Sequence, residues 1–527
     1  MDPVTLQVMA NALRAVAEEM EAALVRSAFS PNIVERRDCS TAIFDGAGRM
    51  VVQSASIPVH LGAMPEAVAA ARERGAAPGE VWLVNDPYRG GTHLPDLTMI
   101  SALPLDGGTA AYAVTRAHHA DVGGMAPGSM PAGSRELLQE GLVIPPVRIV
   151  RDGAPVSDMV DLVLANSRAP GEREGDLRAQ LAAHRLGERR LAEVAARHGT
   201  GRVREAFGAL LDYAERRTRA AIAEMPDGRY EAAEALEGDG VTEDDLWIRV
   251  AVTIAGDRMV VDFDGTDAQG PGNCNCPPAV TRSAVYFVVR CVTDPDIPAS
   301  AGAFAPVEVR APEGTLVNAR PPAAVAGGNV ETSSRIVDAV TAALGAAIDV
   351  PAQGQGTMNN LTLGRPGFTY YETLGGGQGA SSRADGPSGV HVAMSNTLNT
   401  PVEALETAYP LRVEAYRLRR GSGGAGRHRG GDGVERRIRL LVDAEASVIA
   451  ERRRRAPAGR AGGHDGSPGR TSLNDETLPA KWRGFVRAGD VLAIETPGGG
   501  GHGPPPAGSH SAADAGQRPS PTRVQTL

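Results

Sequence analysis

The N-terminal stretch of the chain carries the apolar pattern of an amphipathic helix. Asp2 and Pro3 fit the N-cap and the first helical position, and the pattern ends before Pro31. Between these points apolar residues recur at steps of three and four, which places them on one helical face: Leu6, Met9, Leu13, Val16, Met20 and Leu24. We therefore expect one long helix that packs on the rest of the fold through this face.

Further along the chain, patterns typical of strands alternate with helical ones. Two β-hairpins are predicted, at 40–55 with a turn at Asp45–Gly48 and at 246–266 with a turn at Gly256-Asp257. Residues 80–88, EVWLVNDPY, have the pattern of a buried strand that ends in a turn. Helices are predicted at 175–198, 202–224, 281–292 and 331–348, and short strands and turns dominate from about residue 410.

The order of these elements predicts an α+β fold with several antiparallel hairpins. It is neither a regular alternation of strands and helices nor an internal repeat. At 527 residues the chain is too long for one ordinary core, so we expect several subdomains. The expected division is an N-terminal α+β region, a central α+β region, a β-rich C-terminal region and a disordered tail rich in Pro, Ser, Gly and Ala: 1–228, 229–410, 411–502 and 503–527.

Composition excludes several classes of protein. A net charge of −9 argues against general binding of nucleic acid, and an aromatic content of 4% argues against stacking platforms for bases. The N-terminus has neither the basic start nor the apolar core of a signal peptide, and no run approaches the length of a membrane span. Four cysteines in so long a chain do not form a disulfide framework. We expect a cytoplasmic protein that binds neither nucleic acid nor membranes.

One predicted hairpin carries metal-binding side chains at its open end. Its strands, DLTMISAL and TAAYAVTRA, flank Asp106-Gly107-Gly108, a strong turn signal. Because cross-strand partners lie symmetrically about the turn, a hairpin centred on Gly107 places Asp96 beside His118. His93 precedes them in a Pro-containing turn that can curl back over the same spot. Two imidazoles and one carboxylate leave coordination positions free, as catalytic Zn²⁺, Mn²⁺ or Fe²⁺ sites do.

Other assignments of these side chains remain open. A register slip of one residue would exchange His118 for His119, which is otherwise expected on the opposite face, and any single histidine here could be a plain hydrogen-bonding residue. Asp121 is a candidate catalytic residue, either as a fourth ligand or as a partner that orients an imidazole, and the alternative is a turn residue. Asp38, which follows Arg36 and Arg37, is a candidate general base or the partner of an arginine in an ion pair.

The segments around this hairpin, NDPYRGGTHLPDLTM and RAHHADVGG, resemble the hydantoinase B/5-oxoprolinase family. That family includes the metal-bearing subunits of acetone carboxylase-type enzymes. The resemblance runs over almost the whole chain, through segments such as VERRDCSTAIFDGAGRMVVQSASIPVHLGAMPEAV, DFDGTDAQGPGNCN, SGVHVAMSNTLNTPVEALE and ETPGGGGHG. One departure is visible, because many relatives carry a second histidine two positions after His391, where this chain has Ala393.

The resemblance implies a divalent metal, Zn or Mn, held by His93, Asp96 and His118. It also implies a hydantoinase A-type partner with an actin-like or sugar-kinase-like ATPase fold, which phosphorylates the substrate before this chain completes the reaction. The sequence contains no G-x-x-x-x-G-K-[ST] phosphate loop. ATP would therefore be used by the partner, within a hetero-oligomer.

Three functions follow as hypotheses. The first is ATP-dependent hydrolysis of a small cyclic amide, such as a hydantoin, 5-oxoproline or a related lactam, in which the metal lowers the pKa of water or polarises the substrate oxygen. The second is a role as a subunit of an acetone carboxylase-type enzyme, which forms a carbon–carbon bond with bicarbonate. The third is a non-catalytic scaffold for the A subunit, whose structural metal would have a closed set of four ligands.

Overall fold

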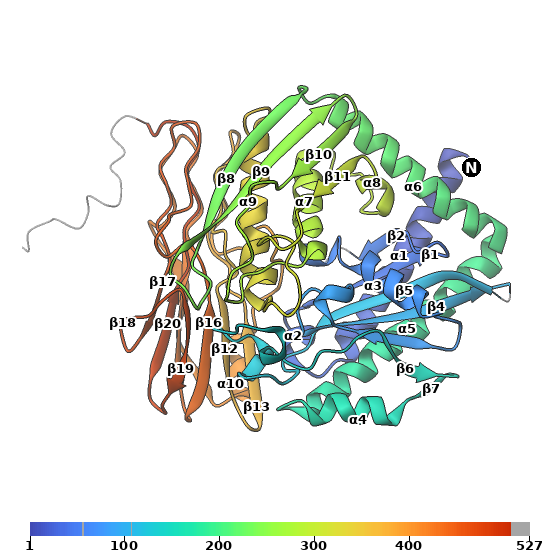
Figure 1. The fold of residues 1–527 in the computed structure, drawn as a ribbon, viewed down its shortest axis with the longest axis horizontal. Coiled ribbons are helices and arrows are strands. Elements are labelled where there is room, and N and C mark those ends of the chain that lie inside the picture. Colours follow the sequence, from blue (N-terminus) through green and yellow to red (C-terminus); the bar gives the residue numbers. More distant parts are fainter. Residues whose placement is uncertain (55–56, 107, 507–527) are drawn as a thin grey trace, which may run out of the picture.

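The computed structural model describes residues 1–54, 57–106 and 108–506. Within these residues, an antiparallel sheet of seven strands forms the N-terminal part, in the order β2-β1-β5-β4-β3-β6-β7 (Figure 1). Its strands are β1 (Cys39–Asp45), β2 (Met50–Ser54), β3 (Val81–Val84), β4 (Asp96–Leu105), β5 (Gly108–His118), β6 (Val147–Arg151) and β7 (Ala154–Pro155). β1 and β2 confirm the first predicted hairpin, and β3 confirms the buried strand.

Helices cover both faces of this sheet. Successive residues of a strand point to opposite faces, so Ile43 of β1 packs in one core cluster with Leu13 of α1, whereas Phe44 packs in another with Val68 of α3. The predicted N-terminal helix is confirmed, and its N-cap Asp2 accepts a hydrogen bond from the backbone N–H of Thr5. The helices of this part are α1 (Pro3–Ser27), α2 (Pro31–Val34), α3 (Met64–Glu73), α4 (Ser157–Ala165), α5 (Pro170–His198) and α6 (Thr200–Ala223).

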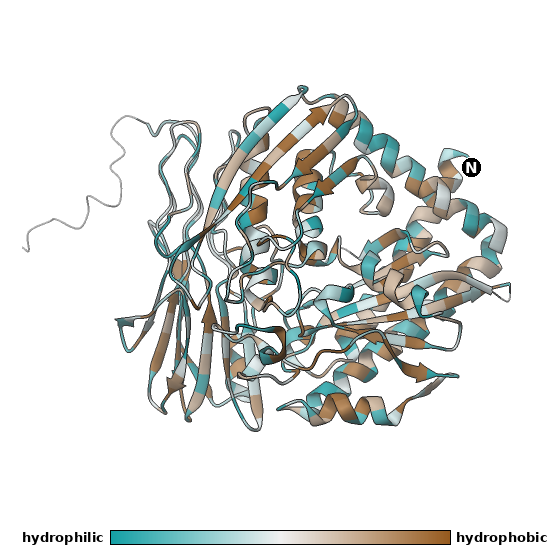
Figure 2. Ribbon diagram, viewed as in Figure 1, coloured by the Kyte–Doolittle hydropathy of each residue, from teal (hydrophilic) through white to brown (hydrophobic). Residues whose placement is uncertain are grey.

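A second sheet of four strands forms the central part, in the order β11-β10-β9-β8. Helices α7 and α9 share one apolar core with it, and Figure 2 shows apolar residues gathered on β9, β10 and β11. β9 and β10 confirm the second predicted hairpin. The elements are β8 (Gly228–Glu237), β9 (Asp245–Ala255), β10 (Arg258–Asp262), α7 (Pro278–Val292), α8 (Ala301–Phe304), β11 (Val307–Arg310) and α9 (Ser333–Leu344), the last preceded by a π-helical turn (Gly328–Thr332).

The C-terminal part is rich in strands, as predicted. Its two sheets have the orders β13-β12-β16-β19 and β14-β15-β20-β17-β18, and they share one apolar core. The elements are β12 (Asn360–Arg365), β13 (Phe368–Glu372), α10 (Val402–Ala408), β14 (Leu411–Arg419), β15 (Gly433–Leu440), β16 (Ala444–Ile449), β17 (Arg470–Leu473), β18 (Glu476–Thr477), β19 (Lys481–Val486) and β20 (Val491–Glu495).

The chain therefore has the predicted α+β fold, built from antiparallel and mixed sheets with several helices. The division into four regions stays a prediction, and most of the tail predicted to be disordered, 507–527, lies outside the described residues. Among the residues that are described, no helix combines the length and the apolar character needed to cross a membrane.

Glycine-rich segments beside the C-terminal sheets pack backbone directly against backbone. Residues 498–501 run through the middle of this packing, where the N–H of Gly499 donates a hydrogen bond to the carbonyl of Gly431. A Cβ atom on Gly499 would lie 2.1 Å from the carbonyl oxygen of Gln378, and one on Gly430 would lie 1.9 Å from the carbonyl oxygen of Gly499. Since no side chain tolerates such distances, close approach of the chains explains the glycines of ETPGGGGHG.

We expect Gly499→Ala to lower the free energy of unfolding by about 3 kcal/mol or more, because the neighbouring backbone must move to admit a methyl group. Gly208→Ala is the matched control, since a Cβ on Gly208, inside α6, would meet no atom within 4 Å. That variant should be more stable than the native chain by about 0.5–1 kcal/mol. Chemical unfolding followed by circular dichroism measures both, and native stability of Gly499→Ala would contradict the packing argument.

Candidate metal centre

The hairpin of β4 and β5 has the register expected from its sequence. Asp96, the first residue of β4, pairs directly with His118, the last residue of β5. The register shifts by one residue between Leu103 and Pro104, close to the turn. Beyond this shift Leu103 pairs with Ala111, and the same register continues to the open end, so the pairing of Asp96 with His118 depends on the shift.

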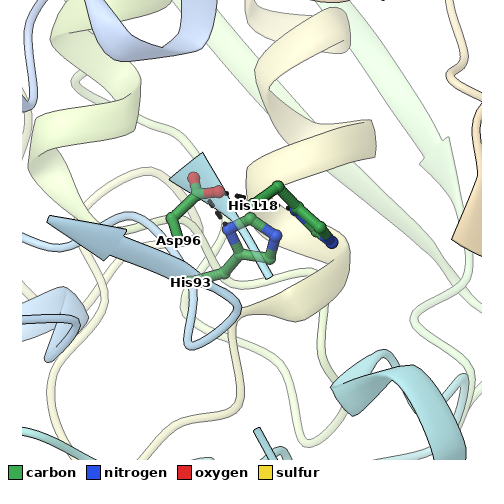
Figure 3. A group of neighbouring side chains, drawn as sticks. All are labelled: His93, Asp96 and His118. Carbon is green, nitrogen blue, oxygen red and sulfur yellow. Dashed lines mark ion pairs between the residues drawn. The ribbon is translucent and has the colours of Figure 1, made fainter. Parts of the chain in front are cut away.

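His93 completes a group of three side chains at this open end (Figure 3). Its carbonyl accepts a hydrogen bond from the backbone N–H of Asp96 at 3.1 Å, which curls the preceding turn over the strand. Nδ1 of His93 lies 3.2 Å from Oδ2 of Asp96, and Nδ1 of His118 lies 3.5 Å from Oδ1 of Asp96. One ligand atom from each of the three residues lies within 4.8 Å of the others.

All three side chains of the group are buried. Burial of Asp96 opposes ionisation, but the histidines around it, His93 first, hold the pKa of this carboxyl well below its usual range. Burial lowers the pKa of His118, which favours the neutral form of this ring. An ionised carboxylate beside neutral imidazole is the protonation state that binds a divalent cation.

The group fits a divalent metal in its chemistry and its spacing. Two ligands of one tetrahedral Zn²⁺, each about 2.0–2.1 Å from the ion, lie about 3.3–3.4 Å apart. The nitrogen-to-oxygen distances of 3.2 and 3.5 Å in this group are close to that separation. The other nitrogen of each ring is an alternative ligand atom, because Nε2 of His93 and Nε2 of His118 are buried without a hydrogen-bond partner among the described residues.

A cavity of about 20 Å³ adjoins the group. This space accommodates one water molecule, which needs roughly 10–15 Å³, but no ring-shaped organic substrate. Its walls come from distant parts of the sequence and include Asp38, His60, Asn329, Met358, Tyr371 and Ser395.

One wall of the cavity is Tyr371 of β13. Its ring stacks on the imidazole of His118, with ring centroids 4.4 Å apart and an angle of 10° between the planes. Its hydroxyl donates a hydrogen bond to Asn360 at 2.8 Å, and Asn360 in turn donates one to Glu331 at 2.9 Å. The guanidinium of Arg36 lies over the Tyr371 ring, 5.1 Å from its centroid. The C-terminal sheet thus holds a histidine of the N-terminal hairpin in place.

Asp38, the candidate general base, lies at the cavity. Its side chain is largely buried and lines the cavity together with the three residues of the group. Its backbone carbonyl accepts a hydrogen bond from the N–H of His118 at 3.0 Å. Among the residues that the structure describes, no lysine, arginine or histidine forms an ion pair with the Asp38 carboxylate, so the alternative of a plain ion pair finds no partner there.

Asp121 and His119 point away from the group. The Asp121 carboxylate accepts hydrogen bonds from the backbone N–H groups of Gly123, Gly128 and Arg168 and pairs with the Arg168 guanidinium at 2.9 Å. These contacts fix the loop after β5 to the segment before α5, so we propose no catalytic role for Asp121. His119 lies 3.0 Å from the amide oxygen of Gln180 on α5, and burial lowers its pKa to about 4.

Two further side chains lie beside the group, His60 and Tyr371, and neither is among the site residues predicted from the sequence. His60 lies in the segment SIPVHLG, and its Nε2 atom is 3.4 Å from Oδ2 of Asp96. Neither residue is close to the hairpin in sequence, and neither belongs to a spacing pattern that predicts a ligand. Both lie in segments that carry the family resemblance, and Tyr371 also stands close to the glycine-rich segment TLGGGQGA.

Comparison with known proteins identifies the family. The family model for hydantoinase B/oxoprolinase matches residues 2–505. An uncharacterised protein of Methanocaldococcus jannaschii is 38% identical over 96% of this chain and 91% of its own length. 5-Oxoprolinase 1 of Arabidopsis thaliana is 36% identical over 95% of this chain but only 42% of its own length. The chain thus spans about two-fifths of the 5-oxoprolinases that it matches.

Two solved structures share the fold. The ATP-dependent caprolactamase from Pseudomonas jessenii superposes with a TM-score of 0.89 at 30% identity, over 96% of this chain and 91% of that chain. Acetone carboxylase in its nucleotide-free form superposes with a TM-score of 0.86 at 19% identity, over 95% of this chain and 76% of that chain, which shows similarity of fold. Because the family model matches nearly the whole chain, the chain belongs to the hydantoinase B/oxoprolinase family.

Proposed function

We propose that this chain is the B-type subunit of an ATP-dependent hydrolase that opens a cyclic amide. The observation that carries the proposal is the buried group of His93, Asp96 and His118 beside a cavity that Asp38 also lines. The names 5-oxoprolinase and caprolactamase, borne by two similar proteins, denote enzymes that act on lactams. We favour the hypothesis of a hydrolase over that of a carboxylase, because the caprolactamase is 30% identical to this chain and the acetone carboxylase only 19%.

The use of ATP is assigned to a partner subunit. The sequence lacks a phosphate-binding loop, and the matched 5-oxoprolinases are more than twice as long as the part that this chain covers. The family description itself distinguishes a B component. We therefore propose a hetero-oligomer with a hydantoinase A-type ATPase that activates the amide.

In the proposed reaction, His93, Asp96 and His118 hold the divalent metal, Zn or Mn. When bound, it supplies Lewis acidity, which polarises an oxygen and favours the loss of a proton from water. Asp38 acts as general base: it accepts a proton from the attacking water, whose oxygen forms a bond with the amide carbon. The carbon–nitrogen bond then breaks, and the ring nitrogen leaves with the proton that Asp38 accepted. A second water molecule then releases, as inorganic phosphate, the phosphoryl group that the partner placed on the amide oxygen. Tyr371 keeps the His118 ring in its orientation.

The substrate must reach the centre from outside the small cavity. A larger cavity of about 920 Å³ lies between α6, α7 and α9, and Val392 and Ala393 line it. The next residues, Met394 and Ser395, line the small cavity. This segment therefore separates the two spaces, and we propose that it moves when substrate enters.

The metal content of the purified chain tests the ligand set. His93→Ala and His118→Ala should each remove the Zn or Mn that the native protein contains, because two remaining side chains hold the ion far more weakly. His119→Ala is the matched control and should retain the metal, since its ring contacts Gln180. Elemental analysis in which both ligand variants keep native metal content would exclude the site, and loss in His119→Ala alone would show that the wrong imidazole was chosen.

The isolated chain should neither hydrolyse ATP nor open hydantoins, 5-oxoproline or other lactams. This follows from the division of labour with an A-type partner. Phosphate release and ring-opened product are measured for the chain alone and after the partner is added. ATP turnover by the chain free of partner would contradict the division, whereas restored turnover and ring opening on reconstitution would support it.

Asp38→Asn should separate catalysis from metal binding. The amide cannot accept the proton of water, so product formation by the reconstituted complex should fall by about 10²–10⁴-fold. Metal content should remain native, because Asp38 lies outside the group of His93, Asp96 and His118. If Asp38→Asn loses the metal instead, Asp38 is a ligand, and native product formation would remove it from the mechanism altogether.

A further inference from the structure

His60 is a third buried imidazole beside Asp96, outside the group of the three ligands. It ends the 3-10 turn Pro58–His60, and its side chain is 1% exposed. Its Nε2 atom lies 3.4 Å from Oδ2 of Asp96 and has no hydrogen-bond partner among the described residues. It also lines the small cavity. A buried ring nitrogen aimed at one carboxylate oxygen needs a physical explanation.

The surroundings of His60 determine which nitrogen carries its proton. Its Nδ1 atom lies 2.8 Å from the hydroxyl of Ser40 on β1, which is itself fully buried. The backbone N–H of Ile57 donates to the same hydroxyl at 3.4 Å, which leaves the hydroxyl hydrogen for Nδ1. With Nδ1 accepting from the Ser40 hydroxyl, the N–H of the ring is on Nε2, where it faces the carboxylate.

Asp96 is held from the other side by Thr92. The Thr92 hydroxyl donates to Oδ2 of Asp96 at 2.5 Å, so this oxygen accepts one hydrogen bond and also has Nε2 of His60 at 3.4 Å, both from residues outside the ligand set. The ligand atoms that all lie within 4.8 Å of one another belong to His93, Asp96 and His118 and do not include a nitrogen of His60. This argues against His60 as a fourth metal ligand.

We propose that His60 is a positioning residue for the metal centre, whose Nε2–H, with the Thr92 hydroxyl, holds the Asp96 carboxylate toward His93 and His118. This inference rests on the proposed metal site and deepens it. Partners that orient a metal-binding carboxylate raise the affinity for the metal by about 10–100-fold without touching the ion. Ser40 contributes through the tautomer that it imposes on His60.

The chain offers a close control in His184 of α5. This imidazole is also buried, and its Nδ1 atom lies 2.7 Å from the hydroxyl of Ser101, the same arrangement as that of His60 with Ser40. Its Nε2 atom lies 3.1 Å from the Thr115 hydroxyl instead of a carboxylate. Replacement of His184 therefore removes an equivalent buried ring without touching Asp96.

The test is the dissociation constant for Zn²⁺, measured by competition with a chelator on the full chain. His60→Leu should weaken binding by about 10–100-fold. His60→Gln, whose amide can place an N–H where Nε2 lies, should stay within about threefold of the native value, and Ser40→Ala should weaken binding by less than about tenfold. His184→Leu should bind Zn²⁺ as the native chain does. Circular dichroism of the metal-free proteins verifies that each variant folds.

Three outcomes would overturn the proposal. Native affinity in a folded His60→Leu variant would show that the ring has no influence on the metal. A loss as complete as that of His93→Ala would make His60 a ligand. If His60→Leu does not fold, native affinity in Ser40→Ala together with a loss of more than tenfold in His60→Gln would contradict the tautomer and the donor that we assign.

The failure of this inference can be distinguished from failure of the proposed function. If His93→Ala abolishes binding of Zn²⁺ while His60→Leu leaves it unchanged, the metal centre stands and only the role of His60 is lost. If the native chain and His93→Ala bind Zn²⁺ equally, the metal centre itself is refuted.

Discussion

The negative charge of Asp96 is the constraint on which the candidate site depends. Its carboxylate is 1% exposed, and removal of such a charge from water costs on the order of several kcal/mol unless neighbouring groups compensate it. Three imidazoles face it, through Nδ1 of His93 at 3.2 Å, Nδ1 of His118 at 3.5 Å and Nε2 of His60 at 3.4 Å. A divalent cation held by the carboxylate compensates its charge more fully than contacts with imidazole nitrogens do. This is the physical reason for the metal that we propose.

The site joins parts of the chain that are far apart in sequence. The hairpin of β4 and β5 supplies Asp96 and His118, the segment before α3 supplies His60, and β13 supplies the Tyr371 ring that stacks on His118. Arg36 strengthens the junction, because its guanidinium donates hydrogen bonds to the carbonyl of Tyr371 and to the hydroxyl of Thr373. The orientation of the metal-binding side chains therefore depends on packing between the N-terminal and C-terminal sheets. The same packing closes the cavity, so the approach of substrate requires movement of a wall.

Local patterns in the sequence predicted the elements that depend on local interactions. The apolar face of α1 follows from helical spacing and is found in the structure. The predicted pairing of Asp96 with His118 is found as well, but it is reached through a register shift between Leu103 and Pro104 that symmetry about the turn does not predict. Contacts between distant segments could not be predicted in this way. The partner of Asp121 is Arg168, 47 residues further along the chain, and the stacking of Tyr371 on His118 depends on how two sheets meet. The glycine-rich segments gave a composition signal, but only the packed structure shows that carbonyl groups fill the space where side chains would be.

The most direct test of the account is to locate the metal by anomalous X-ray scattering in crystals of the chain. Diffraction data collected on either side of the Zn and Mn absorption edges identify the element as well as its position. The account predicts one strong anomalous peak within bonding distance, about 2.0–2.2 Å, of His93, Asp96 and His118. A peak held by other residues, or crystals grown with either metal that show no peak at these three side chains, would contradict it.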